Sequence, residues 1–148
     1  MSVDGFLNSG SGPVLEAMVR FSGARQRLIA HNVANWETPG FRPVDVDPQA
    51  FQAQLGRAID DRRDREARGL GGGLVLDQSG PARLAPGGER MVLKTAPIGD
   101  NLMHHDGNDR QMERLMQDLS ENLLAFRTAS ELLRGRFRSI QQAIRERF

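Results

Sequence analysis

Three adjacent side chains in the last third of the chain, His104, His105 and Asp106, are the residues best suited to bind a metal ion. Imidazole nitrogens and carboxylate oxygens are common ligands of zinc and related metals. Neighbouring residues do not share a helix face, however, and no spaced partner of the HExxH kind accompanies them. We therefore interpret the three as a polar loop ahead of a helix, and we expect no metal and no cofactor. A metal-dependent hydrolase stays open as an alternative hypothesis.

Other catalytic patterns are weaker still. His31 lies within a helical pattern and has no nucleophile pattern near it. The triplet at 71–73 is all glycine but lacks the Lys and Ser or Thr that a phosphate-binding loop requires. No pair of carboxylates has the setting of a general acid and base. The sequence therefore predicts a protein that is not an enzyme.

The composition points to a helical protein with a thin core. Of the 148 residues, 39% are hydrophobic and 5% aromatic, with Trp36 as the single tryptophan and no tyrosine or cysteine. The net charge is +1, and acidic and basic residues alternate, so we expect no nucleic-acid partner. No segment approaches the ~18 apolar residues of a membrane span, and the first residues lack the pattern of a cleavable secretory signal.

A first helix is predicted from Pro13, a good first-turn residue, to about Glu37. Its apolar side chains recur every three to four residues and form one stripe. Arg25 and Asn32 are in register with that stripe, so they lie either at its margin or as polar positions within a helix interface. In such an interface, a buried asparagine fixes the register.

The end of this helix forms a shaped polar corner. Asn32 and Asn35 lie one turn apart, and the residue before Pro39 is pushed out of helical torsions. The sequence from Thr38 to Phe41, which has glycine at its third position, predicts a type II turn. Asparagine near a helix end commonly bonds the local backbone, which is the alternative for Asn35. The combined spacing instead favours docking against other helices.

The middle of the chain is less regular. Asp47 followed by proline predicts the start of a short helix over 48–60, which the charged stretch up to Arg68 could extend. Glycines and prolines break the pattern over 61–103, which we interpret as a mobile insertion with short strands at 74–76 or 90–94. The expected division is a flexible segment 1–12, a helix, turn and short helix over 13–60, the insertion 61–103, and a C-terminal helix over 104–148.

The C-terminal helix is the strongest pattern. Asn108 with Gln111 resembles a capping box, and the helix should run to about Arg147, nearly 40 residues or about 58 Å. Its seam and the side chains that widen it are Met112, Leu115, Leu119, Phe126, Ala129, Leu133 and Ile140, with Met116, Leu123, Phe137 and Ile144.

These elements predict a mainly α fold. The long N- and C-terminal amphipathic helices pair antiparallel as a coiled-coil-like bundle, with a short middle helix and a Gly/Pro-rich loop or short β-hairpin insertion. Two helices cover each other on one side only, so we expect neighbouring molecules to complete the bundle.

The stretch from Leu28 to Phe41 resembles the N-terminal signature of the flagellar rod, hook and filament-junction family, an Asn-Ile-Ala-Asn core followed by Thr-Pro-Gly and an aromatic residue. Trp36 departs from the small residue usual there. The second half is similar to the proximal rod members, although Arg110 and Leu115 depart from their pattern. The matching positions are Asn32, Ala34, Asn35, Thr38, Pro39 and Gly40, then the Asp-Gly-Asn motif ending at Asn108, and Glu113, Met116, Leu119, Asn122, Phe126 and Leu133.

The resemblance implies a structural subunit of the proximal rod, in the periplasmic part of the basal body, that helps transmit torque. It also implies type III export without a cleaved signal, self-association, and contact with other rod proteins, the adaptor FliE and the export gate in the MS ring. A cytosolic coiled-coil adaptor or regulator, or another rod protein, is the alternative. The expected interface residues are Leu28, Asn32, Asn35, Trp36, Thr38, Pro39, Gly40, Asn108, Met116, Leu119, Asn122, Phe126 and Leu133.

Overall fold

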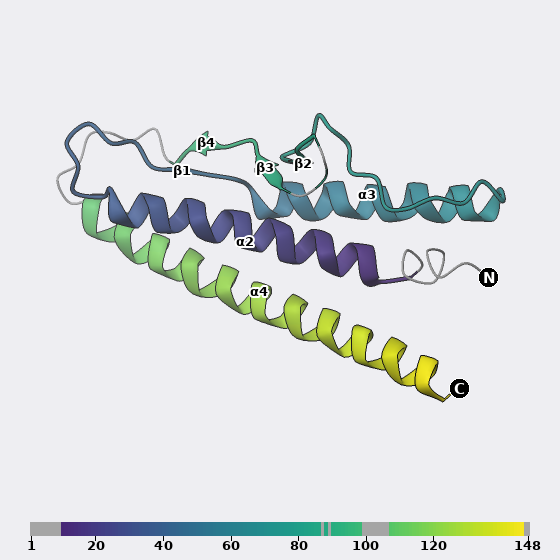
Figure 1. The fold of residues 1–148 in the computed structure, drawn as a ribbon. Helices are drawn as coiled ribbons and strands as arrows, with labels where there is room; N and C mark the ends of the chain where they lie inside the picture. The colour runs from purple at the N-terminus through teal and green to yellow at the C-terminus, as the bar shows by residue number, and fades with distance from the viewer. Residues whose placement is uncertain (1–9, 87, 89, 99–106, 147–148) are drawn as a thin grey trace.

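The computed structural model describes residues 10–86, 88, 90–98 and 107–146, with side chains in the last segment from Met112 onward. The fold is mainly helical, as the sequence predicts (Figure 1). Its elements are α2 (Gly12–Ala34), β1 (Val44–Asp45), α3 (Pro48–Ala67), β2 (Ala82–Leu84), β3 (Met91–Leu93), β4 (Ala96–Pro97) and α4 (Gly107–Arg145).

The first two helices begin and end where local chemistry requires. Proline occupies the first turn of both α2 and α3, where a missing N–H costs no hydrogen bond. The Asp47 carboxylate caps α3 by accepting the Gln49 backbone N–H at 2.8 Å. The charged stretch after residue 60 extends α3 to Ala67, and α2 ends at Ala34, just before the predicted corner.

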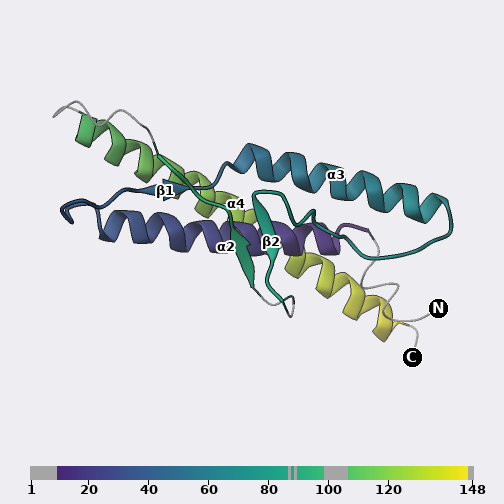
Figure 2. The same cartoon turned by 90° about the horizontal axis from the view of Figure 1, so that it is seen from above.

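Two small antiparallel ladders fill the middle of the chain. β2 pairs with β3, placing Ala82 opposite Leu93 and Leu84 opposite Met91, while β1 pairs with β4. Seen from above, the β2–β3 hairpin crosses α2 (Figure 2). β3 falls within the predicted strand at 90–94, whereas residues 74–76 form no strand. No strand was predicted at β2.

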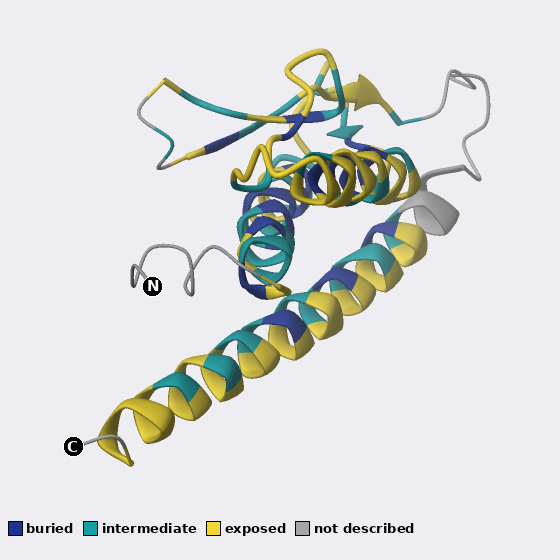
Figure 3. Cartoon of the chain, turned by 90° about the vertical axis from the view of Figure 1, so that its right-hand side faces the viewer, coloured by how far each residue is buried: buried dark blue, intermediate teal, exposed yellow. Residues whose placement is uncertain are grey.

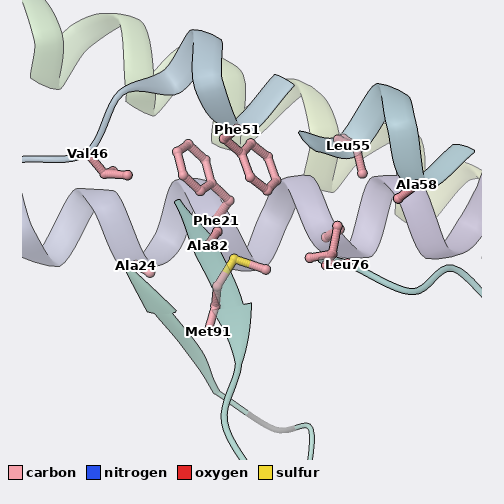
Figure 4. Close-up of a cluster of buried hydrophobic side chains, with 10 residues drawn as sticks. Phe21, Ala24, Val46, Phe51, Leu55, Ala58, Leu76, Ala82 and Met91 are labelled. Carbon is pink, nitrogen blue, oxygen red and sulfur yellow. The ribbon is translucent and has the colours of Figure 1, made fainter. Parts of the chain in front are cut away.

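The main hydrophobic cluster lies between α2, α3 and the β2–β3 hairpin (Figure 4). The Phe21 and Phe51 rings stack with centroids 3.8 Å apart and planes 1° from parallel. Among the described residues, no side chain of α4 belongs to this cluster. Its members are Ala17, Phe21, Ala24, Val46, Phe51, Leu55, Ala58, Leu76, Ala82 and Met91.

The 39-residue helix α4 runs antiparallel to α2, on the face of α2 away from α3 and the hairpin (Figures 1 and 3). Figure 3 shows a narrow line of buried and half-buried residues along α4 and a broad exposed surface around it. The long helix is therefore attached to the rest of the molecule along one edge.

Candidate assembly interface

The polar corner is held by Asn32, which is fully buried. Its side-chain nitrogen donates to the Val44 carbonyl oxygen at 2.7 Å, and its side-chain oxygen accepts the Val44 backbone N–H at 3.3 Å. Asn32 thus pairs both of its polar groups with β1 rather than with α4. Its observed role is to fix the chain that returns along α2 after the corner.

Asn35 closes the last turn of α2. Its side-chain nitrogen donates to the His31 carbonyl oxygen at 2.8 Å and contacts His31 Nδ1 at 3.2 Å. The Phe41 ring meets the His31 ring edge to face at 5.6 Å. These contacts are local bonds of the kind that the alternative interpretation of Asn35 predicts.

The predicted type II turn is confirmed. The Phe41 backbone N–H donates to the Thr38 carbonyl at 3.1 Å, and Gly40 has φ of +78°, a torsion that side chains other than glycine rarely adopt. Thr38, Pro39 and Gly40 are exposed and Trp36 is half-buried. The turn therefore offers a rigid surface at the end of α2 with no cover from the described chain.

Arg25 joins three elements through one buried guanidinium, which is only 6% exposed. Its Nη2 lies 2.6 Å from Asp45 Oδ2 on β1 and 3.5 Å from Asp118 Oδ1 on α4. Burial by itself lowers the pKa of Arg25, but hydrogen bonding and attraction from Asp45 and Asp118 outweigh it, so the pKa is raised. The charge is therefore fixed, and it ties α4 to the corner side of α2.

Asn122 forms the second polar link between α4 and α2. It is 4% exposed, and its side-chain nitrogen donates to the Ser22 carbonyl at 2.9 Å and to Gln26 Oε1 at 2.8 Å. One turn further along α4, the Phe126 ring packs over Gly23, 3.6 Å from where a Cβ would stand. The predicted helix seam is thus polar at its buried centre.

A third link lies near the start of α2, where Arg136 Nη1 donates to Ser11 Oγ at 2.9 Å. Beyond this point, α4 continues past the first residue of α2 to Arg145. Within the described residues, polar links thus join α4 to α2 or to its cap at Asp118, Asn122 and Arg136, and the last turns of α4 extend past α2.

Three parallel rows of α4 differ in exposure. Leu115, Asn122 and Ala129 are buried against α2, and the row of Leu119, Phe126, Leu133 and Ile140 is half-buried. A third row, called the outer row here, also repeats every seven residues, with Met116 42%, Phe137 50% and Ile144 52% exposed and two half-buried members between them. The outer row consists of Met116, Leu123, Ser130, Phe137 and Ile144.

The structure brings the predicted interface residues into two groups. Those of the first half gather at or near the corner, and those of the second half lie along α4. Asn108 belongs to α4, but its side chain is outside the described residues. The buried members are Asn32 and Asn122, and the exposed ones are Met116 and the turn of Thr38, Pro39 and Gly40. The half-buried members are Leu28, Asn35, Trp36, Leu119, Phe126 and Leu133. Contact of these residues with a second molecule stays a prediction.

Sequence patterns missed the residue that organises the middle of the chain, Gln54. This side chain is 1% exposed, donates to the carbonyls of Asp77 and Ala82 at 2.7 Å each, and accepts the Ala82 N–H at 3.3 Å. Gly80 lies over its amide: a Cβ there would stand 2.4 Å from Gln54 Nε2. The available signal was that Gln54 lies directly before Leu55 on the apolar face of α3.

The predicted loop residues His104, His105 and Asp106 lie outside the described part of the chain. Within that part, no three His, Asp or Glu side chains come together as a metal site would require. No helix found there combines the length and hydropathy needed to cross a bilayer.

Comparison with known proteins gives a consistent set of relatives. No family model matches the chain. A protein of Cereibacter sphaeroides is 32% identical over 123 residues, covering 82% of this chain and 83% of the relative, and is named flagellar basal body rod protein FlgB. Proteins of the same name from Yersinia enterocolitica and Salmonella typhimurium are each 27% identical, covering 82% and 88% of this chain and 84% and 94% of the relatives.

Proposed function

Because the chain belongs to the FlgB family of flagellar basal body rod proteins, we propose that it is a structural, non-catalytic subunit of the bacterial flagellar rod. The subunit assembles through its two terminal helices, α2 and α4, and associates with other rod components. The expectation of a rod protein, made from the Asn-rich corner and the C-terminal helix, agrees with the names of these relatives.

The observation that carries the proposal is the one-sided attachment of α4. Large apolar side chains at Met116, Phe137 and Ile144 are 42–52% exposed, although each is large enough to stabilise an interface when covered. Large apolar side chains exposed along one side of a helix fit a protein–protein contact. A helix that is covered on one edge in the single molecule fits a subunit whose bundle is completed by its neighbours.

The finer placement rests on the resemblance. We assign the subunit to the proximal end of the rod, where it links the export gate and the MS ring to the rest of the rod and passes on torque. The adaptor FliE is the expected neighbour on that side, and export proceeds through the type III apparatus without a cleaved signal. The segments 13–60 and 104–148 serve assembly, with α2 and α4 pairing in the manner of a coiled coil, while 61–103 is the insertion between them.

Leu119→Asp tests the assembly role. The side chain is half-buried between the α2-facing row and the outer row, so a carboxylate there disrupts helix packing. In a strain whose own gene is replaced, we expect the variant to reach the export apparatus but to be depleted from purified basal bodies, with loss of swimming. Asn35→Ala is expected to act in the same direction. Normal swimming and normal incorporation of both variants would overturn this assignment of the interface.

The cytosolic coiled-coil adaptor is the rival, because the exposed side chains of α4 could also bind a partner helix in the cytosol; the names of the relatives favour the rod subunit. Immunodetection in purified basal bodies separates the two. A rod subunit co-purifies with the basal body and leaves the cytoplasm only when the flagellar export apparatus is intact, whereas an adaptor stays in the cytosol in both strains.

A further inference from the structure

The Arg25 guanidinium is shared between two acidic side chains that belong to different elements. Its Nη2 lies 2.6 Å from Asp45 Oδ2 on β1, and the same nitrogen lies 3.5 Å from Asp118 Oδ1 on α4. Figure 1 shows β1 and α4 on different sides of α2, so the two carboxylates reach Arg25 from separate parts of the chain. One cation therefore faces two anions.

The two contacts of Arg25 are unequal. Its Nε donates to Asp45 Oδ1 at 3.1 Å, and its Nη2 donates to Asp45 Oδ2 at 2.6 Å. Asp118 contacts Nη2 alone, and its distance of 3.5 Å exceeds the length of a charge-assisted hydrogen bond, about 2.7–2.9 Å. Asp45 thus holds the guanidinium in this structure, while Asp118 is close enough to accept it if Asp45 withdraws.

Burial makes one carboxylate necessary and the second one redundant. The side chain of Arg25 is 7% exposed, against 16% for Asp45 and 26% for Asp118. A buried guanidinium left without a carboxylate is strongly destabilising, whereas one carboxylate balances its single charge. The three side chains together carry an excess negative charge, and the two carboxylates repel each other. The electrostatics therefore favour one close partner at a time, and Arg25 retains a partner when either segment moves away.

Each segment also has an anchor on α2 that does not involve Arg25. The Val44 backbone of β1 is bonded to the Asn32 side chain in both directions. On α4, Asn122 donates to the Ser22 carbonyl. Either segment can therefore give up or strengthen its contact with Arg25 while it stays attached to α2.

We propose that Arg25 is a two-position latch, which holds β1 through Asp45 and passes to Asp118 on α4 when the chain after the corner is drawn away from α2. The corner and α4 then compete for one guanidinium. A contact that displaces β1 tightens the attachment of α4, and by reciprocity the release of α4 tightens the hold on β1. The latch goes beyond the rod role, because it operates within a single chain. It lets either segment adjust to a neighbour without leaving a buried charge unpaired.

Native-state amide hydrogen exchange of the full-length Asp45→Asn variant tests the competition. Asparagine keeps the shape of aspartate and removes its charge, so Arg25 passes to Asp118, and an opening of α4 then leaves a buried charge unpaired. We expect amide exchange around Asp118 to slow by about tenfold. Conversely, Asp118→Asn is expected to slow exchange in the β1–β4 ladder.

Asp47→Asn provides the matched control. Asp47 is exposed, lies two residues after Asp45, and caps α3, a role that asparagine performs equally well. Exchange around Asp118 should therefore stay unchanged in this variant. Faster or unchanged exchange around Asp118 in the Asp45→Asn chain is incompatible with the latch, because side chains that only support one another loosen together.

A double-mutant cycle in denaturant unfolding provides the second measurement. If either carboxylate is enough for Arg25, the variant with both Asp45→Asn and Asp118→Asn raises the unfolding equilibrium constant by about tenfold or more beyond the product of the two single effects. The cycle of Asp45→Asn with Asn122→Ala is the control and should be multiplicative, because Asn122 bonds α2 without contacting Arg25.

A double effect equal to or smaller than the product of the single effects of Asp45→Asn and Asp118→Asn would overturn the latch, whatever the outcome of the basal-body experiments. If the double variant does not fold, the exchange rates of the two single variants decide, since both of those chains keep one carboxylate beside Arg25.

Discussion

The two faces of α2 are covered by different chemistry. On one face, α3 and the β2–β3 hairpin bury a cluster of aliphatic side chains around the stacked rings of Phe21 and Phe51. On the other face, α4 packs on α2 along a narrow line that mixes apolar side chains, with Leu115 and Ala129 buried, and polar links at Arg25 and Asn122. The first unit is thus held by an apolar core, whereas the contact with α4 is narrower and partly polar.

We call the unit of α2, α3 and the β2–β3 hairpin the central lobe. The difference implies that the central lobe and α4 differ in their local free energies of unfolding. We expect the lobe to keep its core when α4 detaches, because no described residue of α4 belongs to that core. In contrast, α4 keeps several large side chains exposed even when attached. A subunit built this way has a stable part that preserves its shape and a helix that is free to adjust to neighbours. Four changes test this contrast.

Phe51→Ala should have the largest effect. Phe51 is 3% exposed and stacks on Phe21, so truncation removes apolar burial and leaves a cavity at the centre of the lobe. We expect a loss of about 3–5 kcal/mol in the free energy of unfolding. Denaturant unfolding followed by circular dichroism measures it. Phe137→Ala, at a 50% exposed position of α4, is the matched control and should change the stability of the isolated chain much less.

Gly80→Ala should have the next largest effect. Its Cβ would stand 2.4–2.9 Å from the side-chain atoms of Gln54, which is itself held by the Asp77 and Ala82 carbonyls. The loop must move or the buried amide must lose its bonds, at a cost of about 1–3 kcal/mol. Gly56→Ala, in α3 with open space at the Cβ, should instead stabilise by roughly 0.5–1 kcal/mol. Equal melting temperatures for the two variants would contradict the role given to Gln54.

Asn122→Ala should act on α4 alone. The change removes two hydrogen bonds to α2 from a buried position, at a cost of about 1–2 kcal/mol. We expect faster amide hydrogen exchange throughout α4 and unchanged protection in α3 and the hairpin. Thr128→Ala, an exposed position on the same helix, provides the control. Uniformly faster exchange in both regions would show that α4 and the lobe unfold together, against the contrast drawn here.

The same contrast separates what sequence patterns revealed from what they missed. The three-to-four spacing of apolar residues predicted α2 and α4, and the Thr-Pro-Gly sequence predicted the turn at Gly40, because each depends on residues close in the chain. The packing of 69–98 depends on distant partners: Leu76, Ala82 and Met91 complete a core begun by α2 and α3. The glycines and prolines of this segment interrupt any regular pattern, so its contribution to the core could not be predicted from the sequence. The mobility expected of the insertion stays a prediction, which hydrogen exchange can test.

The candidate interface divides in the same way. The sequence placed Asn32 in register with the apolar stripe, at its margin or within a helix interface, and the family resemblance named Asn122 as an interface residue. Asn122 does join α4 to α2, but Asn32 bonds the backbone of β1, which the helical pattern could not predict because Val44 lies beyond the turn. Arg25 was noted as a polar residue in register with the apolar stripe, yet its partners come from two other elements. Periodicity locates such residues, and only the fold identifies their partners.

The smallest effect is expected from acid, and it falls on the lobe rather than on α4. Hydrogen bonds from the Ser79 backbone N–H and hydroxyl hold the pKa of Asp77 below its ordinary value of 3.8. A lowered folded-state pKa contributes stability that is present above the unfolded pKa and is lost as the pH falls through the folded one. The guanidinium of Arg25 has a raised pKa, so it stays charged throughout the acid range.

Acidification from pH 5 to below the folded-state pKa of Asp77, which lies under 3.8, should therefore loosen the turn at residues 77–80, while the lobe core, which is apolar, stays intact. NMR titration of the Asp77 carboxyl and the Ser79 amide measures this directly, and Asp77→Asn removes the pH dependence of the Ser79 signal. If Ser79 shows no pH dependence in the unmodified chain, the turn is held by backbone packing over Gln54 instead. In that case the loop at residues 77–80 is held to the lobe by apolar and amide contacts alone. The lobe would then differ more clearly from α4, which is linked to α2 through the charged side chain of Arg25.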